Sequence, residues 1–576
     1  SEMCIRDSYY CGDGVEKDFA KTVEWCRMAA RQGHADAQWR LGRCYGLGEG
    51  VEKNYEKAVE YYSKAAEQGQ VKAQNNLAVC YINGSGVIKD PAKAVEWFRK
   101  AAEQGSAMAQ YNLGVCYDRG NGVTKNAEEA VKWYRKAAEQ GYAGAQYSLG
   151  DCYYYGNGVE ENNEKAVKWY QKAAEQDDAE AQCQLGVCYY YGWGVAEDEE
   201  EAVKWYRKAA EQGYAIAQLK LADCYYHGNG VEENNEKAVK WYRKAAEQDD
   251  AEAQCQLGVC YEFGYGVAKS LAQAAGWYRK SAEQGFARAQ CNLGVCYYNG
   301  NGVTKNYAEA VEWCRKSAEQ GFARAQYALG VCYEFGHGVT KDLAQAVKWY
   351  QEAAERDDAM AQCNLGHCYE MGNGVEKNLA KAAEWYRKAA ERDNARAQCN
   401  LGNFYEYGKG VTKNYAEAVE WYRKSAEQGY ARAQYELGWS YRIGQGVEQD
   451  YAQAVKWYQK AAEQGYADAQ NALGSCYKNG YGVEKNAAKA VEWYRKAAEQ
   501  GEVHAQYNLG GCYENGIGGL TQNNDEALKW YKKAADQGYE EAKKAIDRMQ
   551  GGGLGSAVAA GAALAGVGLL WKILNS

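Results

Sequence analysis

Cysteine is the residue type with the most obvious chemical potential in this chain of 576 residues, which contains 21 cysteines. Twelve of them recur in one column at multiples of 36 residues, among them Cys116, Cys152, Cys188, Cys224, Cys260, Cys296, Cys332 and Cys368. Five more precede that column by five positions: Cys183, Cys255, Cys291, Cys363 and Cys399. Two residues five apart on a helix point about 140° apart, and column neighbours about 10 Å apart lie beyond disulfide reach. We therefore predict reduced thiols that fill a core in a reducing compartment.

Metal and catalytic chemistry have no matching pattern. The sequence contains no Cys-x-x-Cys, and its five histidines lie in scattered segments: His34, His227, His337, His367 and His504. No Ser-His-Asp order, no His-Glu-x-x-His and no supported pair of carboxylates occurs. The recurring Gly-x-Gly loops join two helices, whereas a phosphate-binding loop follows a strand. We predict no enzyme, no catalytic or metal site, no cofactor and no small-molecule substrate.

The charge pattern argues against a nucleic-acid partner. The net charge is −9, and acidic and basic residues are mixed throughout. Phosphate binding requires a basic stripe, which we do not find. The recurring Arg-Lys pair, such as Arg135-Lys136, is followed by Glu139. We interpret it as a solvated face.

A 36-residue repeat organises these residues. Tryptophan recurs at this interval from Trp97 to Trp493. Within one repeat, Ala145, Leu149 and Cys152 have the spacing of a helical stripe in a segment that we call helix A. A Gly-x-Gly turn follows helix A and leads to a segment that we call helix B. The helix B of the preceding row has a second stripe of the same spacing: Ala130, Tyr134, Ala137 and Ala138.

The ends of helix B carry recognisable sequence patterns. Asn126 with Glu129, Asn306 with Glu309 and Asn414 with Glu417 match an N-cap with a reciprocal glutamate, and Pro91 is expected at a first helical position. Glycine follows Glu-Gln at the C-terminal end at positions 105, 141, 213, 285 and 321. Aspartate replaces that glycine in four repeats, at Asp177, Asp249, Asp357 and Asp393.

The predicted fold is therefore all-α. One helix pair cannot bury its apolar face alone, so neighbouring pairs must stack. We predict an α/α superhelical solenoid of about fourteen 36-residue helix-turn-helix repeats, with a concave and a convex side.

The pattern Ala-x-Ala-Gln-x-x-Leu-Gly-x-Cys-Tyr, Gly-x-Gly-Val, Ala-Val-x-Trp-Tyr-x-Lys-Ala-Ala-Glu-Gln-Gly resembles the Sel1-like repeat, a relative of the tetratricopeptide repeat. The resemblance implies an α/α superhelix and an adaptor role in protein complexes. Secreted cysteine-rich members carry a cysteine pair that links the two helices of a repeat, whereas helix B here supplies only Cys26 and Cys314. We divide the chain into a non-repeat leader at 1–8, interpreted as a fragment start, repeats at 9–538, a capping helix at 539–550, and a tail at 551–576.

Candidate binding residues lie on helix A, which by analogy with tetratricopeptide arrays lines the concave side. The position two after the recurring glutamine is rich in amides, which are suited to the backbone of an extended peptide or to a helix. These candidates are Asn112, Gln184, Gln256, Asn292, Asn364 and Asn400, together with Trp439 three residues beyond the same register. Ordinary polar surface and packing between repeats are the alternative. Tyr153–Tyr155 and Tyr189–Tyr191 are further candidate contacts, although many of those rings are expected in the core.

The tail contains an uncharged run from Leu554 to Trp571, 18 residues long, which is just sufficient to span a bilayer. Its apolar candidates for membrane contact are Leu554, Leu564, Leu569, Leu570 and Trp571. The excess of flanking cations on the repeat side would leave the solenoid in the cytosol. An oligomerisation helix and a disordered or foreign tail are the alternatives.

These observations lead to three hypotheses. The first is a cytoplasmic scaffold that binds proteins in a groove, either free or tethered to a membrane through its C-terminus. The second is a membrane-associated adaptor of a ubiquitin-ligase or protein quality-control complex. The third is a secreted cysteine-rich Sel1-like hydrolase. The number of unpaired thiols separates them, because the secreted forms require disulfides.

Overall fold

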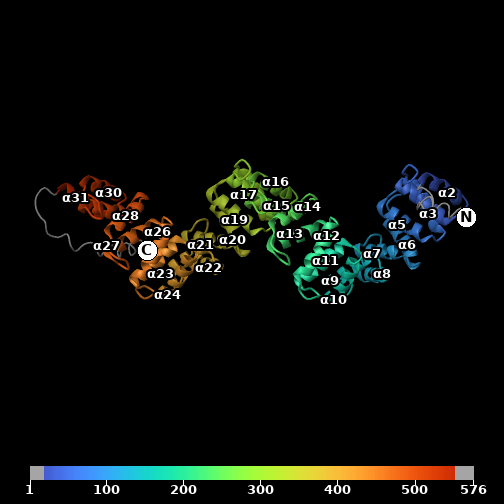
Figure 1. Cartoon of the computed structure of the whole chain (residues 1–576), viewed down its shortest axis with the longest axis horizontal. Coiled ribbons are helices and arrows are strands. Elements are labelled where there is room, and N and C mark those ends of the chain that lie inside the picture. The colour runs from blue at the N-terminus through green and yellow to red at the C-terminus, as the bar shows by residue number, and fades with distance from the viewer. Residues whose placement is uncertain (1–17, 552–576) are drawn as a thin grey trace. The chain divides into compact units, whose positions relative to one another are not determined.

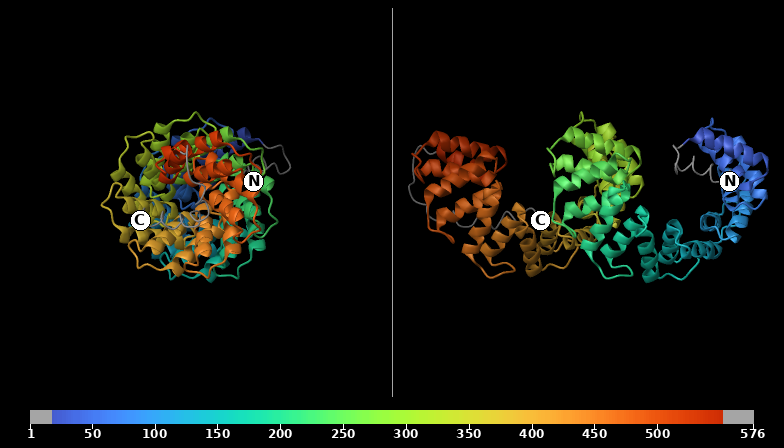
Figure 2. Two further views of the ribbon diagram at one scale, coloured as in Figure 1. Left: turned by 90° about the vertical axis from the view of Figure 1, so that its left-hand side faces the viewer. Right: turned by 45° about the vertical axis from the view of Figure 1, so that its right-hand side comes forward.

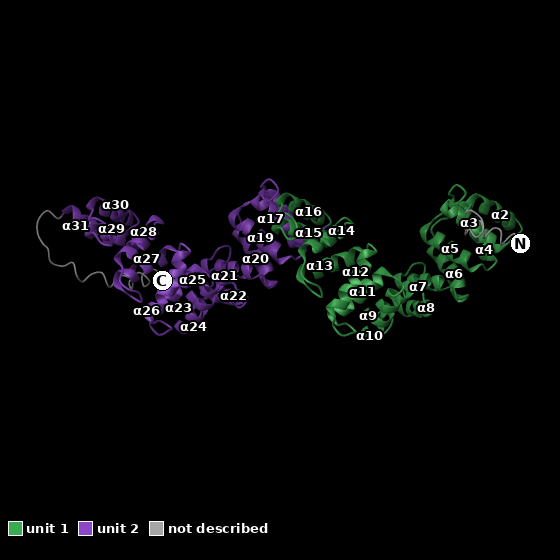
Figure 3. Cartoon of the chain, viewed as in Figure 1, with its two compact units in different colours: residues 1–284 green, residues 285–576 purple. Residues whose placement is uncertain are grey.

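The structure is a computed structural model that describes residues 18–551. These residues form thirty α-helices and no strand (Figure 1). The chain divides into two compact units, residues 1–284 and residues 285–576 (Figure 3). Each unit is an α-solenoid in which consecutive helices pack against each other. The predicted all-α repeat solenoid is thus confirmed.

Unit 1 alternates B and A helices, all of 12 or 13 residues. Its B helices are α2 (Phe19–Arg31), α4 (Tyr55–Glu67), α6 (Pro91–Glu103), α8 (Ala127–Glu139), α10 (Asn163–Ala174), α12 (Glu199–Glu211), α14 (Asn235–Ala246) and α16 (Leu271–Glu283). Its A helices are α3 (Ala35–Leu47), α5 (Val71–Asn83), α7 (Ala107–Arg119), α9 (Ala143–Tyr155), α11 (Ala179–Tyr191), α13 (Ala215–His227) and α15 (Ala251–Phe263).

Unit 2 continues the same alternation, and Figure 2 gives two further views of the stacked pairs. Its A helices are α17 (Ala287–Asn299), α19 (Ala323–Phe335), α21 (Ala359–Met371), α23 (Ala395–Tyr407), α25 (Ala431–Ile443), α27 (Ala467–Asn479), α29 (Val503–Asn515) and α31 (Glu540–Gly551). Its B helices are α18 (Tyr307–Glu319), α20 (Leu343–Glu355), α22 (Leu379–Glu391), α24 (Tyr415–Glu427), α26 (Tyr451–Glu463), α28 (Ala487–Glu499) and α30 (Asn524–Asp536).

The helix ends form where the sequence predicts them. Asn126 Oδ1 accepts a hydrogen bond from the Glu129 backbone N–H at 3.0 Å, and Pro91 is the first residue of α6. The glycines after Glu-Gln have positive φ, for example 95° at Gly213. The four substituting aspartates also have positive φ, between 56° and 65°. Aspartate pays more than glycine for this conformation because its Cβ approaches the backbone.

The Gly-x-Gly loop has a structural purpose in each repeat. Gly156 ends α9 with a φ of 69°, and Gly158 lies against the first turn of α8. A Cβ on Gly158 would lie 2.4 Å from the Ala127 carbonyl carbon, so no larger residue fits. The two glycines therefore turn the chain and dock the loop on the preceding helix B.

Buried glutamines join successive repeats. Gln110 on α7 donates to the Ala102 carbonyl of α6 at 3.0 Å and accepts from Gln140, which follows α8, at 2.7 Å. The same pair of bonds recurs along both units, for example at Gln182 with Gln212 and at Gln434 with Gln464. We call the A-helix members, from Gln38 to Gln506, the buried glutamine column. Satisfying both ends of a buried amide ties three helices together.

The cysteine column lies in the core, as predicted. All nineteen cysteines within residues 18–551 are buried. Phe404 and Ser440 occupy the two positions of the column that lack cysteine, and they are buried as well. Burial raises the pKa of Cys116 to about 11 and that of Cys188 to about 12, which keeps these thiols protonated and unreactive at neutral pH.

The recurring Arg-Lys pair is exposed, but it is more than the solvated face that we predicted. Arg135 donates to the Tyr153 hydroxyl at 3.1 Å, and Lys136 Nζ lies 4.0 Å from the centre of the Trp133 ring. Related contacts recur in most repeats. Basic residues therefore interact with the protein's own rings because ring faces attract cations.

Candidate protein-binding face

The A helices place the predicted amide residues in one register. Each amide follows a member of the buried glutamine column by two residues, as Asn112 follows Gln110. The amides are half-buried, and they lie beside the neighbouring A helix of the same unit. We call Asn112, Gln184, Gln256, Asn292, Asn364 and Asn400 the amide column.

Half of this column is engaged within the protein. Asn112 donates to Asn75 Oδ1 on α5 at 3.0 Å. Asn364 on α21 accepts a hydrogen bond from the Arg396 guanidinium on α23, and Asn292 also has a partner. These contacts match the alternative of packing between repeats.

The other half has no hydrogen-bond partner among the described residues. Gln184 on α11, Gln256 on α15 and Asn400 on α23 make no side-chain hydrogen bond to any residue that the structure describes, and each is partly exposed to solvent. Each amide offers a donor and an acceptor, the two groups that an extended peptide backbone requires.

Trp439 contributes little accessible surface. Its side chain is 9% exposed, and the Arg442 guanidinium lies 5.4 Å from its ring centre. The same position in other repeats is also used internally, since Asp151 and Asp223 accept hydrogen bonds of 2.7 Å from the buried hydroxyls of Tyr170 and Tyr242. Burial raises the pKa of Asp151 above its usual range, although the Tyr170 hydroxyl opposes this rise.

The charge beside the amide column differs between the two units, and this difference was not predicted. One helical turn earlier, on the same helix face, unit 1 has Glu180 and Glu252. At that position unit 2 has four exposed arginines: Arg288, Arg324, Arg396 and Arg432. Arginine is therefore the commonest residue at this position in unit 2, although Asp468 also occurs there, whereas unit 1 has acidic residues and one lysine, Lys72.

The tyrosine triplets divide between core and surface. Tyr153 and Tyr189 pack against the buried clusters of their repeats. Tyr155 and Tyr191 are 61% and 54% exposed. In each triplet, only the third tyrosine therefore has more than half of its side chain exposed to solvent.

The histidines lie in separate places. His337 shares a hydrogen bond of 2.8 Å with the Tyr298 hydroxyl, and His504 shares one of 2.8 Å with Glu502. Within residues 18–551, no three His, Cys, Asp or Glu side chains are arranged so that they could hold a metal ion.

The predicted membrane contacts Leu554, Leu564, Leu569, Leu570 and Trp571 lie outside the described residues, as does the leader at 1–8. Of the helices between Phe19 and Gly551, none is long and apolar enough to cross a membrane. The last of them, α31, packs against α30, and Arg548 pairs with both carboxylate oxygens of Glu514 at 2.5 and 2.7 Å.

Comparison with known proteins identifies the repeat. Fifteen consecutive segments match the model of the Sel1 repeat, from residues 1–34 through 36-residue units to residues 503–539. No curated protein matches the chain significantly.

The chain is also similar to several solved structures. A protective antigen of uropathogenic Escherichia coli strains, which displays an SLR fold, is 34% identical with a TM-score of 0.63; the match covers 94% of this chain and 99% of that one. A Sel1 repeat protein from Oxalobacter formigenes is 34% identical over 53% of this chain and 88% of its own, with a TM-score of 0.43. The immunity protein Pa5087 from Pseudomonas aeruginosa is 26% identical over 37% and 81%, with a TM-score of 0.27.

Proposed function

Because the chain belongs to the Sel1 repeat family, we propose that it is a non-catalytic scaffold that binds other proteins along the exposed faces of its A helices. Its repeats are built from contacts that serve packing, and they recur with little change. Specific recognition then depends on the positions that vary between repeats and reach solvent, which are concentrated on helix A.

The observation that carries this proposal is the set of unengaged amides. Gln184, Gln256 and Asn400 share one register, are half-buried, and leave both halves of each amide without a protein partner within residues 18–551. An extended peptide or a helix of a partner would supply the missing hydrogen bonds. Each bond to a partly desolvated amide contributes about 1 kcal/mol of binding free energy.

Affinity capture with the full chain tests the proposal. We expect the triple variant Gln184→Ala, Gln256→Ala, Asn400→Ala to lose partners that the unmodified chain captures. The matched control is Gln171→Ala, Gln351→Ala, Gln459→Ala, which removes three exposed amides from B helices. Equal loss from both variants, or no loss from the first, would contradict binding at the amide column.

The compartment and the tail remain part of the proposal. Buried, protonated thiols suit a reducing cytoplasm, and the apolar run in the tail would tether the scaffold to a membrane. Neither the ubiquitin-ligase adaptor nor the secreted hydrolase is favoured by a specific feature of the described residues. The scaffold is therefore the one function that we propose.

A further inference from the structure

Five exposed aromatic side chains of unit 1 occupy equivalent positions, where A helices end and the next loop begins. Tyr155, Tyr191 and Phe263 are the last residues of α9, α11 and α15, and Trp193 and Tyr265 follow two of them by two residues. Their exposed fractions lie between 37% and 61%. We call these five residues the aromatic ridge.

Ring contacts pair ridge residues within a repeat and join one pair to the preceding repeat. Tyr191 stacks on Trp193 with ring centres 4.6 Å apart, and Phe263 stacks on Tyr265 at 5.7 Å. Trp193 also contacts Tyr154 of the preceding repeat at 5.6 Å. Exposed, mutually stacked rings of this kind are typical of protein-binding surfaces.

The ridge lacks the cations that cover rings elsewhere in the chain. Lys136 lies over Trp133 at 4.0 Å, Lys305 over Tyr307 at 4.7 Å, and comparable contacts recur in nearly every repeat. In the part of the chain that the structure describes, no lysine or arginine lies over a ridge ring. The ring faces that are not stacked on another ridge ring are therefore open to a cation from outside.

The loops that follow Tyr155 and Tyr191 carry the opposite charge from most other loops, whereas the loop after Phe263 keeps the usual lysine, Lys269. The position five residues after the first loop glycine is lysine in most repeats, for example Lys125, Lys269 and Lys305. It is acidic in three successive repeats, which are those that follow Tyr155, Tyr191 and His227. The acidic residues are Glu161, Glu197 and Glu233, each with an acidic neighbour at 160, 198 or 232.

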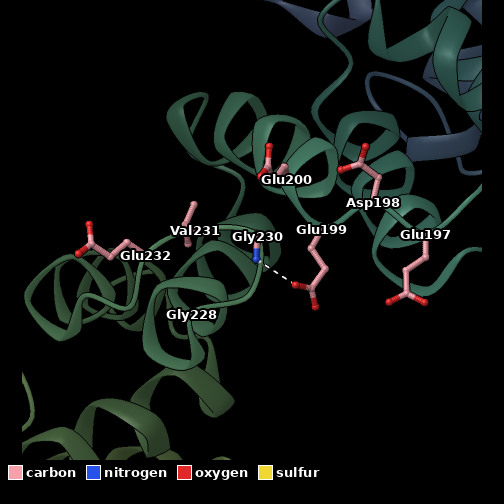
Figure 4. A pocket seen from close by; sticks show the side chains of 8 residues that line it. All are labelled: Glu197, Asp198, Glu199, Glu200, Gly228, Gly230, Val231 and Glu232. Atoms are coloured by element: carbon pink, nitrogen blue, oxygen red, sulfur yellow. Dashed lines mark hydrogen bonds between the residues drawn. The ribbon is translucent and has the colours of Figure 1, made fainter.

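A pocket of 720 Å³ lies among these acidic loops (Figure 4). Glu197–Glu200 line one side, and Gly228 and Gly230–Glu232 line the other. Glu199 accepts a hydrogen bond from the Gly230 backbone N–H at 3.0 Å, which holds the two loops together. The carboxylates of Glu197, Glu200 and Glu232 remain exposed to the pocket's solvent.

We propose that the aromatic ridge and the adjoining acidic pocket bind an extended basic segment of a partner protein. Lysine or arginine side chains of that segment lie on the ridge rings and in the pocket, where the rings and carboxylates attract cations together. Anionic partners such as nucleic acid are repelled by the same carboxylates. The inference rests on the proposed scaffold function but uses a surface distinct from the amide column.

Fluorescence anisotropy with the full chain tests this binding. The probe is a labelled peptide of alternating Arg and Gly, about twelve residues and roughly 40 Å long when extended, at about 150 mM salt. We expect it to bind, and the same peptide with Glu in place of Arg not to bind. The double variant Tyr191→Ala, Trp193→Ala should weaken binding about tenfold. The triple variant Glu197→Gln, Glu200→Gln, Glu232→Gln keeps side-chain shape and should weaken it similarly.

The matched control is Phe335→Ala, which removes a ring that is 59% exposed at the same repeat position in unit 2, where Lys341 follows. It should leave the affinity unchanged. Equal binding by all variants, equal binding of the acidic peptide, or no binding of the basic peptide would overturn the inference. The amide-column variant should bind the basic peptide normally. If the basic peptide does not bind the ridge, the affinity capture through the amide column can still succeed. If that capture fails, binding of the basic peptide to the ridge can still be observed.

Discussion

The buried glutamine column has one member whose hydrogen bonding is incomplete. Gln362 on α21 is buried, it donates to the Ala354 carbonyl at 3.0 Å, and its Oε1 has no partner among the described residues. The residue that would donate to it is Arg392, which pairs with Asp357 instead. Arg356, in the preceding repeat, reaches Gln326 only at 3.4 Å. A buried acceptor without a donor costs folding free energy.

The substitution Arg392→Gln should repair this junction. Glutamine at the equivalent positions donates at 2.7 to 2.9 Å, so the new bond should stabilise the junction by about 1 kcal/mol. The substitution also removes the exposed ion pair between Arg392 and Asp357, and this loss offsets only part of the gain in stability. Hydrogen exchange of α21 and α22 should slow about fivefold. Arg392→Ala, which removes the ion pair without restoring the bond, should not slow exchange; if it does, the missing bond is not the cause.

At this scale the sequence predicted where amides recur but not what each amide contacts. The buried glutamines were visible only as a repeated letter, because their partners lie about 30 residues away and meet them only after the helices pack. The amide column divided for the same reason: Asn112 meets Asn75 on the preceding A helix, whereas the residue at the corresponding position for Gln184 is Tyr147. Single side-chain partners depend on the neighbouring repeat, which the period alone does not determine.

At the scale of one helix, the link after helix B is the strained element in four repeats. Asp249 has a φ of 63°, whereas Gly213 at the equivalent link has a φ of 95°. A Cβ on Gly213 would contact nothing within 4 Å, so only backbone strain distinguishes the residues there. A substitution at these links therefore measures the cost of positive φ alone, because an added side chain meets no neighbouring atom.

The substitution Asp249→Gly should stabilise its repeat by about 1 kcal/mol, and Gly213→Ala should destabilise its repeat by about 1 to 2 kcal/mol. Urea unfolding followed by circular dichroism, with hydrogen exchange on α13 to α15, measures both changes. If both substitutions shift stability in the same direction, strain at positive φ is not the determining factor.

The helices themselves were the most predictable part of the molecule. Asn126, Pro91 and Gly213 each act locally, through caps and φ preferences, so their effects can be read from a few neighbouring residues. The acidic loops were not recognised as a group. Glu161, Glu197 and Glu233 are unremarkable singly, and they matter because stacking aligns them beside exposed rings. Surface properties of a solenoid arise between repeats rather than within one.

At the scale of the whole chain, the tail remains a prediction about location. If the run from Leu554 to Trp571 inserts into a bilayer, the full chain should fractionate with membranes, and a variant without residues 551–576 should not. Substituting Leu564 and Leu569 by lysine should release the full-length chain in the same way, because central charges oppose insertion. Identical behaviour of all three forms would exclude the anchor.

The cysteine columns make the stability of the whole chain sensitive to alkaline pH. Burial raises the pKa of Cys116 to about 11 and that of Cys188, Cys224 and Cys260 to about 12, from about 9 in the unfolded chain. Above pH 9 the unfolded chain releases thiol protons that the folded chain retains. The contribution of these groups to the free energy of unfolding is therefore complete below pH 9 and is lost as the pH rises toward 12.

Urea unfolding and thiol modification both test whether these thiols are buried and reduced. Raising the pH from 7 to 10 should lower the urea concentration at the midpoint of unfolding. At pH 8 a thiol reagent should modify the native chain slowly, because thiolates are the reactive form. In denaturant without reductant, all 21 cysteines should react, and prior reduction should not raise that number. A rise after reduction would demonstrate disulfides, which would contradict reduced core thiols and favour a secreted protein, since an oxidising compartment is where such bonds persist.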